Sequence, residues 1–129
     1  MANKPTILVV DDDAPIVTLM RSLLREFGFD PVTATSGAEA IEIARANPPA
    51  LVLLDKNMPG MNGADVARAL RADPAFERLP ILILSGEPMS AAELAEMKAD
   101  GAVMKPFDVT ALVEQIRKYV NNPRVEAAG

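Results

Sequence analysis

The chain has 129 residues, of which 50% are hydrophobic, and its formal net charge is −5. A chain of this length fits a single domain with a substantial buried core. It contains no cysteine and no histidine, which excludes disulfides, thiol catalysis, a serine–histidine–aspartate triad and imidazole metal ligands. Any bound metal ion must therefore be held by oxygen atoms, which favours Mg²⁺, Ca²⁺ or Mn²⁺.

The charged residues and apolar segments narrow the expected partners and location. Lysine and arginine do not cluster into a basic patch, so we expect no direct binding to nucleic acid. The N-terminus lacks the pattern of a signal peptide, and no apolar segment approaches the roughly 20 residues that a membrane helix needs. We therefore expect a cytoplasmic protein that does not insert into membranes.

Five short segments, taken in chain order, predict five strands. Four of them are apolar runs, mostly of branched aliphatic residues, bounded by turn residues, and such runs are typical of buried strands in a parallel sheet. The second segment is less apolar and reads as a short extended stretch. The predicted strands are 7–10, 30–34, 51–54, 81–84 and 102–104.

Helical patterns follow the predicted strands. The first helix ends at Gly28 and has apolar residues at helical spacing, namely Ile16, Leu19, Met20, Leu23 and Phe27. The second and fourth helices begin at the pairs Ser36–Glu39 and Ser90–Glu93, which have the S-x-x-E pattern of a capping box. The two serines also mark where the connection from the preceding strand ends.

The third helix follows Asn62-Gly63, and Asp108 caps the fifth. Their predicted inner faces are Val66, Ala67 and Leu70 in the third helix, and Val109, Leu112, Val113, Ile116 and Val120 in the fifth. Five strand–helix units with short links imply an α/β fold with a doubly wound parallel sheet. We expect one domain over residues 1–122 and a flexible tail over residues 123–129.

Polar side chains suited to phosphoryl chemistry stand directly after four of the predicted strands. They are Asp11, Asp12, Asp13, Asp55, Ser85 and Lys105. In open parallel sheets the ligand site lies outside the carboxyl ends of the strands. The pattern therefore predicts that these side chains surround one crevice.

Two of the acidic residues after the first strand have no structural reason to be there. Asp13 precedes Ala14-Pro15 and is a good helix N-cap. Asp11 and Asp12 remain, and two carboxylates about 4 Å apart repel by about 4 kcal/mol at an effective dielectric constant of about 20. A divalent cation would offset this repulsion. Asp55, from the neighbouring strand, would add a third carboxylate with an oxygen free to act as a nucleophile.

Ser85 and Lys105 suit the opposite side of a phosphoryl group. Alone, Ser85 beside Gly86 is typical of a turn, and a lysine before proline is typical of a solvated surface. At the ends of neighbouring strands, however, a hydroxyl and an ammonium can bind phosphoryl oxygens opposite a cation, as phosphoryl transfer requires. No glycine-rich phosphate-binding motif occurs, so nucleotide binding is not expected.

With these residues in place, the chain resembles the receiver domain of two-component response regulators over residues 5–120. The matching segments are I-L-V-V-D-D-D (7–13), D-K-N-M-P-G-M-N-G (55–63), L-S-G (84–86) and K-P-F (105–107). The resemblance implies a flavodoxin-like (βα)5 fold with strand order 2-1-3-4-5. It also implies a signalling switch that catalyses its own phosphorylation and dephosphorylation, rather than an ordinary enzyme.

The resemblance further implies a role for each acidic residue of the crevice. Asp55 would accept a phosphoryl group from a phosphohistidine on a sensor histidine kinase or a histidine phosphotransfer protein. Asp11, Asp12, Asp55 and the backbone carbonyl of Asn57 would hold Mg²⁺, with Mn²⁺ as a substitute. Asp12 would be a direct ligand, and Asp11 would act mainly through water.

The remaining implications concern the phosphoryl oxygens and the output surface. Ser85 and Lys105 would bind the phosphoryl oxygens, and the Lys105–Pro106 peptide bond would be cis. A downstream protein would bind the face formed by the fourth helix, the fifth strand and the fifth helix. Relatives usually carry Tyr or Phe three residues before the lysine, where this chain has Ala102.

Two other functions stay open beside the phospho-acceptor receiver. A degenerate receiver would act as a binding module independent of phosphorylation. This alternative stays open because position 102 is alanine rather than the usual aromatic residue. A phosphatase is the other, because Asp11-x-Asp13 after I-L-V-V also resembles the haloacid-dehalogenase superfamily, with Asp11 as nucleophile and Asp13 as acid/base. That family needs a further acidic pair after the lysine, where this chain has only Asp108 nearby.

Overall fold

The computed structural model describes residues 4–105 and 108–121. All five predicted strands are present, and no bound differs from its prediction by more than one residue. The elements are β1 (Thr6–Val10), α1 (Ala14–Glu26), β2 (Asp30–Ala34), α2 (Gly37–Ala46), β3 (Leu51–Asp55), α3 (Gly63–Arg71), a 3₁₀ turn (Pro74–Phe76), β4 (Ile81–Ser85), α4 (Ala91–Met97), β5 (Gly101–Met104) and α5 (Val109–Asn121).

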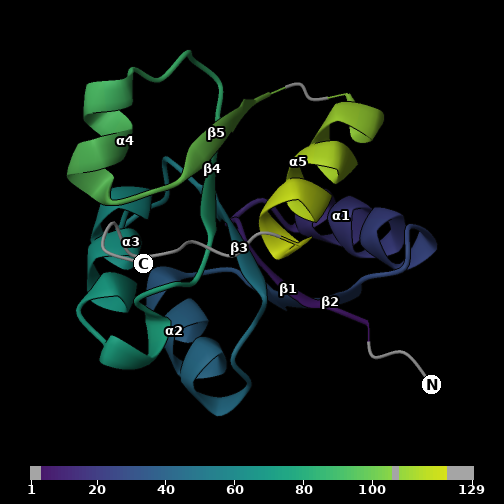
Figure 1. Ribbon diagram of the computed structural model, residues 1–129, viewed down its shortest axis with the longest axis horizontal. Helices are drawn as coiled ribbons and strands as arrows, with labels where there is room; N and C mark the ends of the chain where they lie inside the picture. The colour runs from purple at the N-terminus through teal and green to yellow at the C-terminus, as the bar shows by residue number, and fades with distance from the viewer. Residues whose placement is uncertain (1–3, 106–107, 122–129) are drawn as a thin grey trace.

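The strands form one parallel sheet in the order β2-β1-β3-β4-β5, which confirms the predicted topology. Figure 1 shows the sheet at the centre, with α1 and α5 on one side and α2, α3 and α4 on the other. Because each strand is followed by a helix, all carboxyl ends of the strands point to the same edge of the sheet. Residues following the strands therefore meet there.

Two hydrophobic clusters fill the layers on either side of the sheet. The strands supply both clusters, because alternate side chains point to opposite faces. Ala40, Ala44, Val66, Ala67, Leu70 and Met97 of α2, α3 and α4 pack on one face. Met20, Leu24, Leu112, Val113 and Ile116 of α1 and α5 pack on the other. The predicted inner faces of α3 and α5 are thus confirmed.

The predicted inner face of α1 is partly wrong. Its buried residues are Val17, Met20 and Leu24, whereas Leu19 is 50% exposed and Phe27 36% exposed. Several adjacent apolar residues in this helix allow more than one stripe at helical spacing, and only packing against the sheet selects one.

The predicted end of α1 is confirmed. Gly28 has a φ of 91°, the left-handed conformation that favours glycine. Its N–H donates to the Arg25 carbonyl, and the Phe29 N–H donates to the Leu24 carbonyl. These two hydrogen bonds form a Schellman motif, which satisfies carbonyls at the helix end.

The two predicted capping boxes differ. At α4, Ser90 accepts from the Glu93 N–H and the Glu93 side chain accepts from the Ser90 N–H, so the box is complete. At α2, Ser36 accepts from the Glu39 N–H, but the Glu39 carboxylate accepts from the Thr35 N–H instead. The serine caps α2 as predicted, while its glutamate satisfies a donor one residue earlier.

The other helix starts also depend on polar side chains. Asp108 accepts from the Thr110 N–H at 2.9 Å, as predicted for the start of α5. Asp13 occupies the N-cap position of α1, but its side chain accepts no capping hydrogen bond. Asn62 and Asp65 form a complete capping box at α3. This box was not predicted, because its residues differ from the S-x-x-E pattern.

A buried ion pair joins α3 to the loop before β5. Arg71 Nη2 lies 3.0 Å from Asp100 Oδ2, and the two side chains are 5% and 12% exposed. The same Asp100 oxygen accepts from the Ile81 N–H at 2.8 Å. The Arg71 guanidinium also donates to the backbone carbonyls of Phe76, Leu79 and Lys98. This contact ties three chain segments together at the edge of the sheet opposite the strand ends that carry the predicted site.

Two predictions fall on residues that are not described. They are the cis Lys105–Pro106 bond and the flexible tail over residues 123–129. Within residues 4–105 and 108–121, no helix is both long enough and apolar enough to cross a membrane.

Candidate functional site

The sheet brings the predicted site residues to one edge. Asp11 and Asp12 follow β1, Asp55 is the last residue of β3, Ser85 is the last residue of β4, and Lys105 follows β5. β1 and β4 each pair directly with β3, and β5 pairs with β4, so these residues come from adjacent strands. Residues far apart along the chain therefore lie at one edge of the sheet.

Three carboxylates converge at this edge of the sheet. Asp11, Asp12 and Asp55 each offer an oxygen, and these oxygens all lie within 4.8 Å of one another. Asp11 is 1% exposed and Asp55 is 7% exposed, whereas Asp12 is exposed to solvent. The cluster is thus open on the Asp12 side and buried at its base.

Lys105 bridges the two buried carboxylates. Its Nζ atom lies 3.0 Å from Asp55 Oδ1 and 3.2 Å from Asp11 Oδ2. Partial burial lowers the pKa of Lys105, but its hydrogen bonds to Asp55 and Asp11 outweigh this effect, so that its pKa is raised. The lysine therefore stays cationic at neutral pH and holds the acidic cluster together.

Burial raises the pKa of Asp55 above its ordinary value. The hydrogen bond and the charge of Lys105 oppose this rise, while the negative charges of Asp11 and Asp12 add to it. A desolvated carboxylate held next to two others is poorly stabilised by the protein alone. Its environment favours a reaction or a ligand that removes this excess of negative charge.

The cluster fits a hard divalent cation. Asp11 Oδ1 accepts from the Asp13 N–H at 3.0 Å and Asp11 Oδ2 contacts Lys105, so this carboxylate is held rigidly at the base. Asp12 and Asp55 have oxygens directed into the same space, and carboxylate oxygens are the ligands that Mg²⁺ prefers. One ammonium against three carboxylates leaves an excess of negative charge that a divalent cation would balance.

The Ser85 hydroxyl forms its hydrogen bonds with the backbone of Glu87. It donates to the Glu87 carbonyl at 2.7 Å and accepts from the Glu87 N–H at 3.1 Å. The residue is 2% exposed, so its hydroxyl is satisfied within its own loop. The side chain of Asn57, on the loop after β3, is exposed.

Gly63, at the start of α3, lies against the backbone that carries Asp55. A Cβ atom built on Gly63 would lie 2.6 Å from the Asp55 carbonyl oxygen, and its N–H donates to the Lys56 carbonyl at 3.0 Å. This contact could not be predicted from the sequence, because a glycine after Asn62 is equally typical of an ordinary turn. The close approach shows why only glycine fits here.

We expect Gly63→Ala to destabilise the fold by about 1 to 3 kcal/mol, because the added methyl group meets backbone atoms that cannot turn aside. Gly86→Ala is the matched control, since a Cβ there meets no atom within 4 Å. The control is expected to change stability by less than about 0.5 kcal/mol. Urea denaturation of both variants measures the difference, and equal midpoints would contradict the close contact.

Comparison with known proteins shows the family to which the chain belongs. Residues 7–117 match the family described as the response regulator receiver domain. The chain belongs to this family, whose members act in two-component signalling and receive phosphate from histidine kinases. Receiver domains bind Mg²⁺ at an acidic cluster, which here corresponds to Asp11, Asp12 and Asp55.

Individual relatives agree with this assignment. The chain is 42% identical over 113 residues to the DNA-binding response regulator MtrA of Mycobacterium tuberculosis, covering 86% of this chain and 48% of MtrA. It is 36% identical over 115 residues to the chemotaxis protein CheY of Pseudomonas aeruginosa, covering 87% and 93% of the two chains. The chain thus spans about half the length of its MtrA relatives.

Solved structures show the same architecture. Chemotaxis protein CheY4 of Vibrio cholerae superimposes with a TM-score of 0.86 at 28% identity, over 90% of this chain and 98% of that one. A putative response regulator from Chloroflexus aurantiacus also gives a TM-score of 0.86, at 30% identity and 93% and 100% coverage. These findings favour neither the degenerate receiver nor the phosphatase.

Proposed function

We propose that Asp55 is the phospho-acceptor of this receiver domain. The observation that carries the proposal is the convergence of three carboxylates and the Lys105 ammonium at the carboxyl ends of adjacent strands. The donor would be a phosphohistidine on a sensor histidine kinase or a histidine phosphotransfer protein. The P–N bond of the donor breaks, a P–O bond to Asp55 forms, and the imidazole leaves with a proton.

The residues around Asp55 have distinct parts in this reaction. Lys105 already contacts Asp55 Oδ1 and would follow the new oxygens as a flexible point charge. The Ser85 hydroxyl would turn from Glu87 to donate to a phosphoryl oxygen. Together, the ammonium and the hydroxyl would stabilise the negative charge on one side of the phosphoryl group.

Asp11, Asp12, Asp55 and the backbone carbonyl of Asn57 would hold Mg²⁺, or Mn²⁺ in its place. Because both Asp11 oxygens already have partners, Asp12 is the better direct ligand and Asp11 would act mainly through water. When bound, the ion would neutralise charge on the transferring phosphoryl oxygens.

The wider setting follows from the same assignment. Residues 1–122 would form the receiver domain of a cytoplasmic signalling protein, with residues 123–129 as a flexible tail. A downstream protein would bind the α4–β5–α5 face, where Ala102 is exposed and Met104 is 50% exposed. A groove of about 360 Å³ between β5 and α5 lies on this face. That the chain does not itself bind nucleic acid stays a prediction.

The test is phosphoryl uptake from acetyl phosphate. We expect the intact mass to rise by one phosphoryl group in the presence of Mg²⁺ and to stay unchanged when EDTA removes the metal, because the uncompensated carboxylates repel the incoming anion. A receiver domain known to accept acetyl phosphate serves as the positive control. Absence of uptake by the folded protein with Mg²⁺, while the control reacts, would contradict the proposal.

A further inference from the structure

An ion pair connects the residue next to the phospho-acceptor to α4. Lys56 follows Asp55 directly, and its Nζ atom lies 3.4 Å from Glu93 Oε2 in the first turn of α4. The two side chains are 26% and 47% exposed. The partners are 37 residues apart in the sequence, so only the fold brings them together.

Glu93 belongs to the start of α4 and to the loop before it. Its Oε1 atom accepts from the Ser90 N–H at 3.2 Å, while Oε2 faces Lys56. The hydrogen bond from the Ser90 backbone and then the positive charge of Lys56 lower the pKa of Glu93. A displacement of Ser90 would therefore carry the Glu93 carboxylate with it.

Lys56, in contrast, is anchored to the sheet and to α3. Its backbone N–H donates to the Leu84 carbonyl at 2.9 Å, and its carbonyl accepts from the Gly63 N–H at 3.0 Å. Leu84 belongs to β4 and Gly63 to α3, and both elements contribute buried residues to the core. One partner of the ion pair is thus fixed, while the other depends on the loop over residues 86–90.

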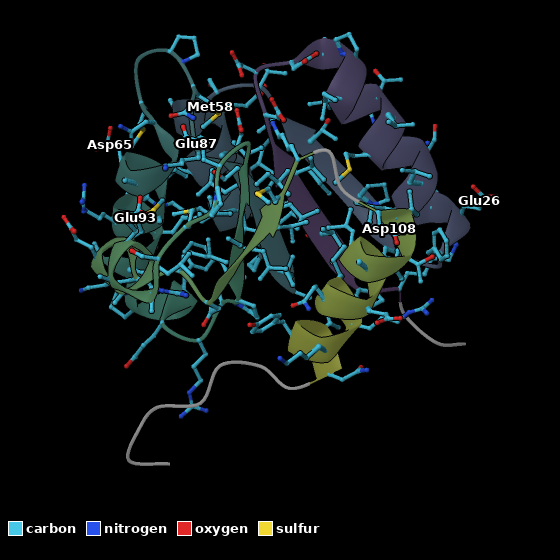
Figure 2. All side chains as sticks on the ribbon, turned by 90° about the horizontal axis from the view of Figure 1, so that it is seen from above. Glu26, Met58, Asp65, Glu87, Glu93 and Asp108 are labelled. Atoms are coloured by element: carbon cyan, nitrogen blue, oxygen red, sulfur yellow. The ribbon has the colours of Figure 1, made fainter. Side chains whose placement is uncertain are left out.

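Ser85 holds the opposite end of that loop. Its hydroxyl bonds both the carbonyl and the N–H of Glu87, and Figure 2 shows Glu87 and Glu93 on the same side of the sheet, away from Asp108 at the start of α5. If Ser85 turns toward a phosphoryl group on Asp55, its donated hydrogen bond to Glu87 is lost. The loop over residues 86–90 then loses this hydrogen bond at its start. The Lys56–Glu93 ion pair beyond its other end is left to hold α4 in place.

We propose that the Lys56–Glu93 ion pair restrains α4 in the resting state and is released when Asp55 carries a phosphoryl group. The inference rests on the proposed function of Asp55. Ala102 has no aromatic ring at the position where relatives usually carry Tyr or Phe. In this chain the ion pair would instead couple the state of Asp55 to the N-terminus of α4.

If the ion pair exists only in the resting state, removing it should change the affinity for beryllofluoride. A contact present only in the resting state opposes binding of any ligand that favours the other state, so its removal strengthens that binding. Exposed ion pairs change an equilibrium by about 1.4- to 5-fold. We expect Lys56→Met and Glu93→Gln each to bind beryllofluoride, with Mg²⁺, more tightly by about that factor, as measured by ¹⁹F NMR.

The two variants separate the proposal from simple charge effects. Lys56→Met removes a positive charge near an anionic ligand, which alone would weaken binding, whereas Glu93→Gln removes a negative charge. Glutamine also retains the capping box at α4. The matched control is Glu96→Gln, because Glu96 is an exposed residue of the same helix and lines one shallow pocket together with Lys56 and Glu93. We expect this control to match the wild type.

A double variant and a second measurement complete the test. Lys56→Met combined with Glu93→Gln should bind no more tightly than either alone, because both changes remove one interaction. Without beryllofluoride, amide hydrogen exchange in α4 should be faster in both single variants than in the wild type and in Glu96→Gln.

Opposite shifts for the two variants, unchanged affinity, or unchanged exchange in α4 would each overturn the inference. A different result is expected if Asp55 is not the phospho-acceptor. In that case the wild type and Asp55→Asn would both bind no beryllofluoride, which removes the release step, while exchange in α4 would still report whether the pair restrains the helix.

Discussion

We expect Asp55→Asn to take up no phosphoryl group from acetyl phosphate under conditions in which the wild type is modified. The amide lacks the nucleophilic carboxylate oxygen, and no second carboxylate occupies its position at the end of β3. Asp30→Asn is the matched control, because Asp30 is exposed at the start of β2, at the opposite edge of the sheet. We expect this variant to reach wild-type uptake, as measured by intact mass.

Mapping the modified residue separates the receiver from the phosphatase. Asp11 would carry the phosphoryl group if it were the nucleophile, but both of its oxygens are already bonded to Asp13 and Lys105. Peptide mapping after reduction of the acyl phosphate should therefore locate the group at Asp55. Modification at Asp11, or uptake that survives in Asp55→Asn, would be incompatible with the proposed function.

Arg71→Met is the substitution we expect to cost the most stability, about 3 to 5 kcal/mol. Methionine fills the space of the aliphatic stem but removes the guanidinium that lies 3.0 Å from the Asp100 carboxylate, which is 12% exposed. It also removes donors from carbonyls at Phe76, Leu79 and Lys98. Removing one partner of a buried ion pair costs far more stability than removing one partner of an exposed pair.

Arg68→Met provides the comparison on the same helix. The Arg68 side chain is 51% exposed, and its contact with Asp65 is 3.8 Å long. Such a pair contributes less than about 1 kcal/mol, so this variant should unfold close to the wild-type urea concentration. Similar midpoints for the two arginine variants would show that the Arg71 contact does not stabilise the fold as its burial indicates.

The positions of the strands, and the places in the fold of the residues of the candidate site, could be predicted from the sequence with little error. Apolar runs in the centre of a parallel sheet are buried on both faces, so their hydrophobicity is continuous and their ends are sharp. Asp55 and Ser85 were placed correctly at such ends, and Lys105 one residue beyond. The convergence of these residues follows from parallel topology alone, because all carboxyl ends share one edge.

The side-chain geometry of the site could not be predicted in this way. That the Ser85 hydroxyl turns to Glu87 and that Lys105 bridges two carboxylates depend on distances set by packing. The same holds for the exposed Leu19, because α1 offers several apolar stripes and the sheet selects one.

By itself, the sequence determined the fold class, the order of the elements and the residue types available for phosphoryl chemistry, because these depend on local patterns of period and spacing. Only the tertiary structure decided which groups touch. Gly63 against Asp55, Arg71 with Asp100 and Lys56 with Glu93 are contacts between distant segments. Their energies depend on burial and on separations of a few ångströms, which no local pattern encodes.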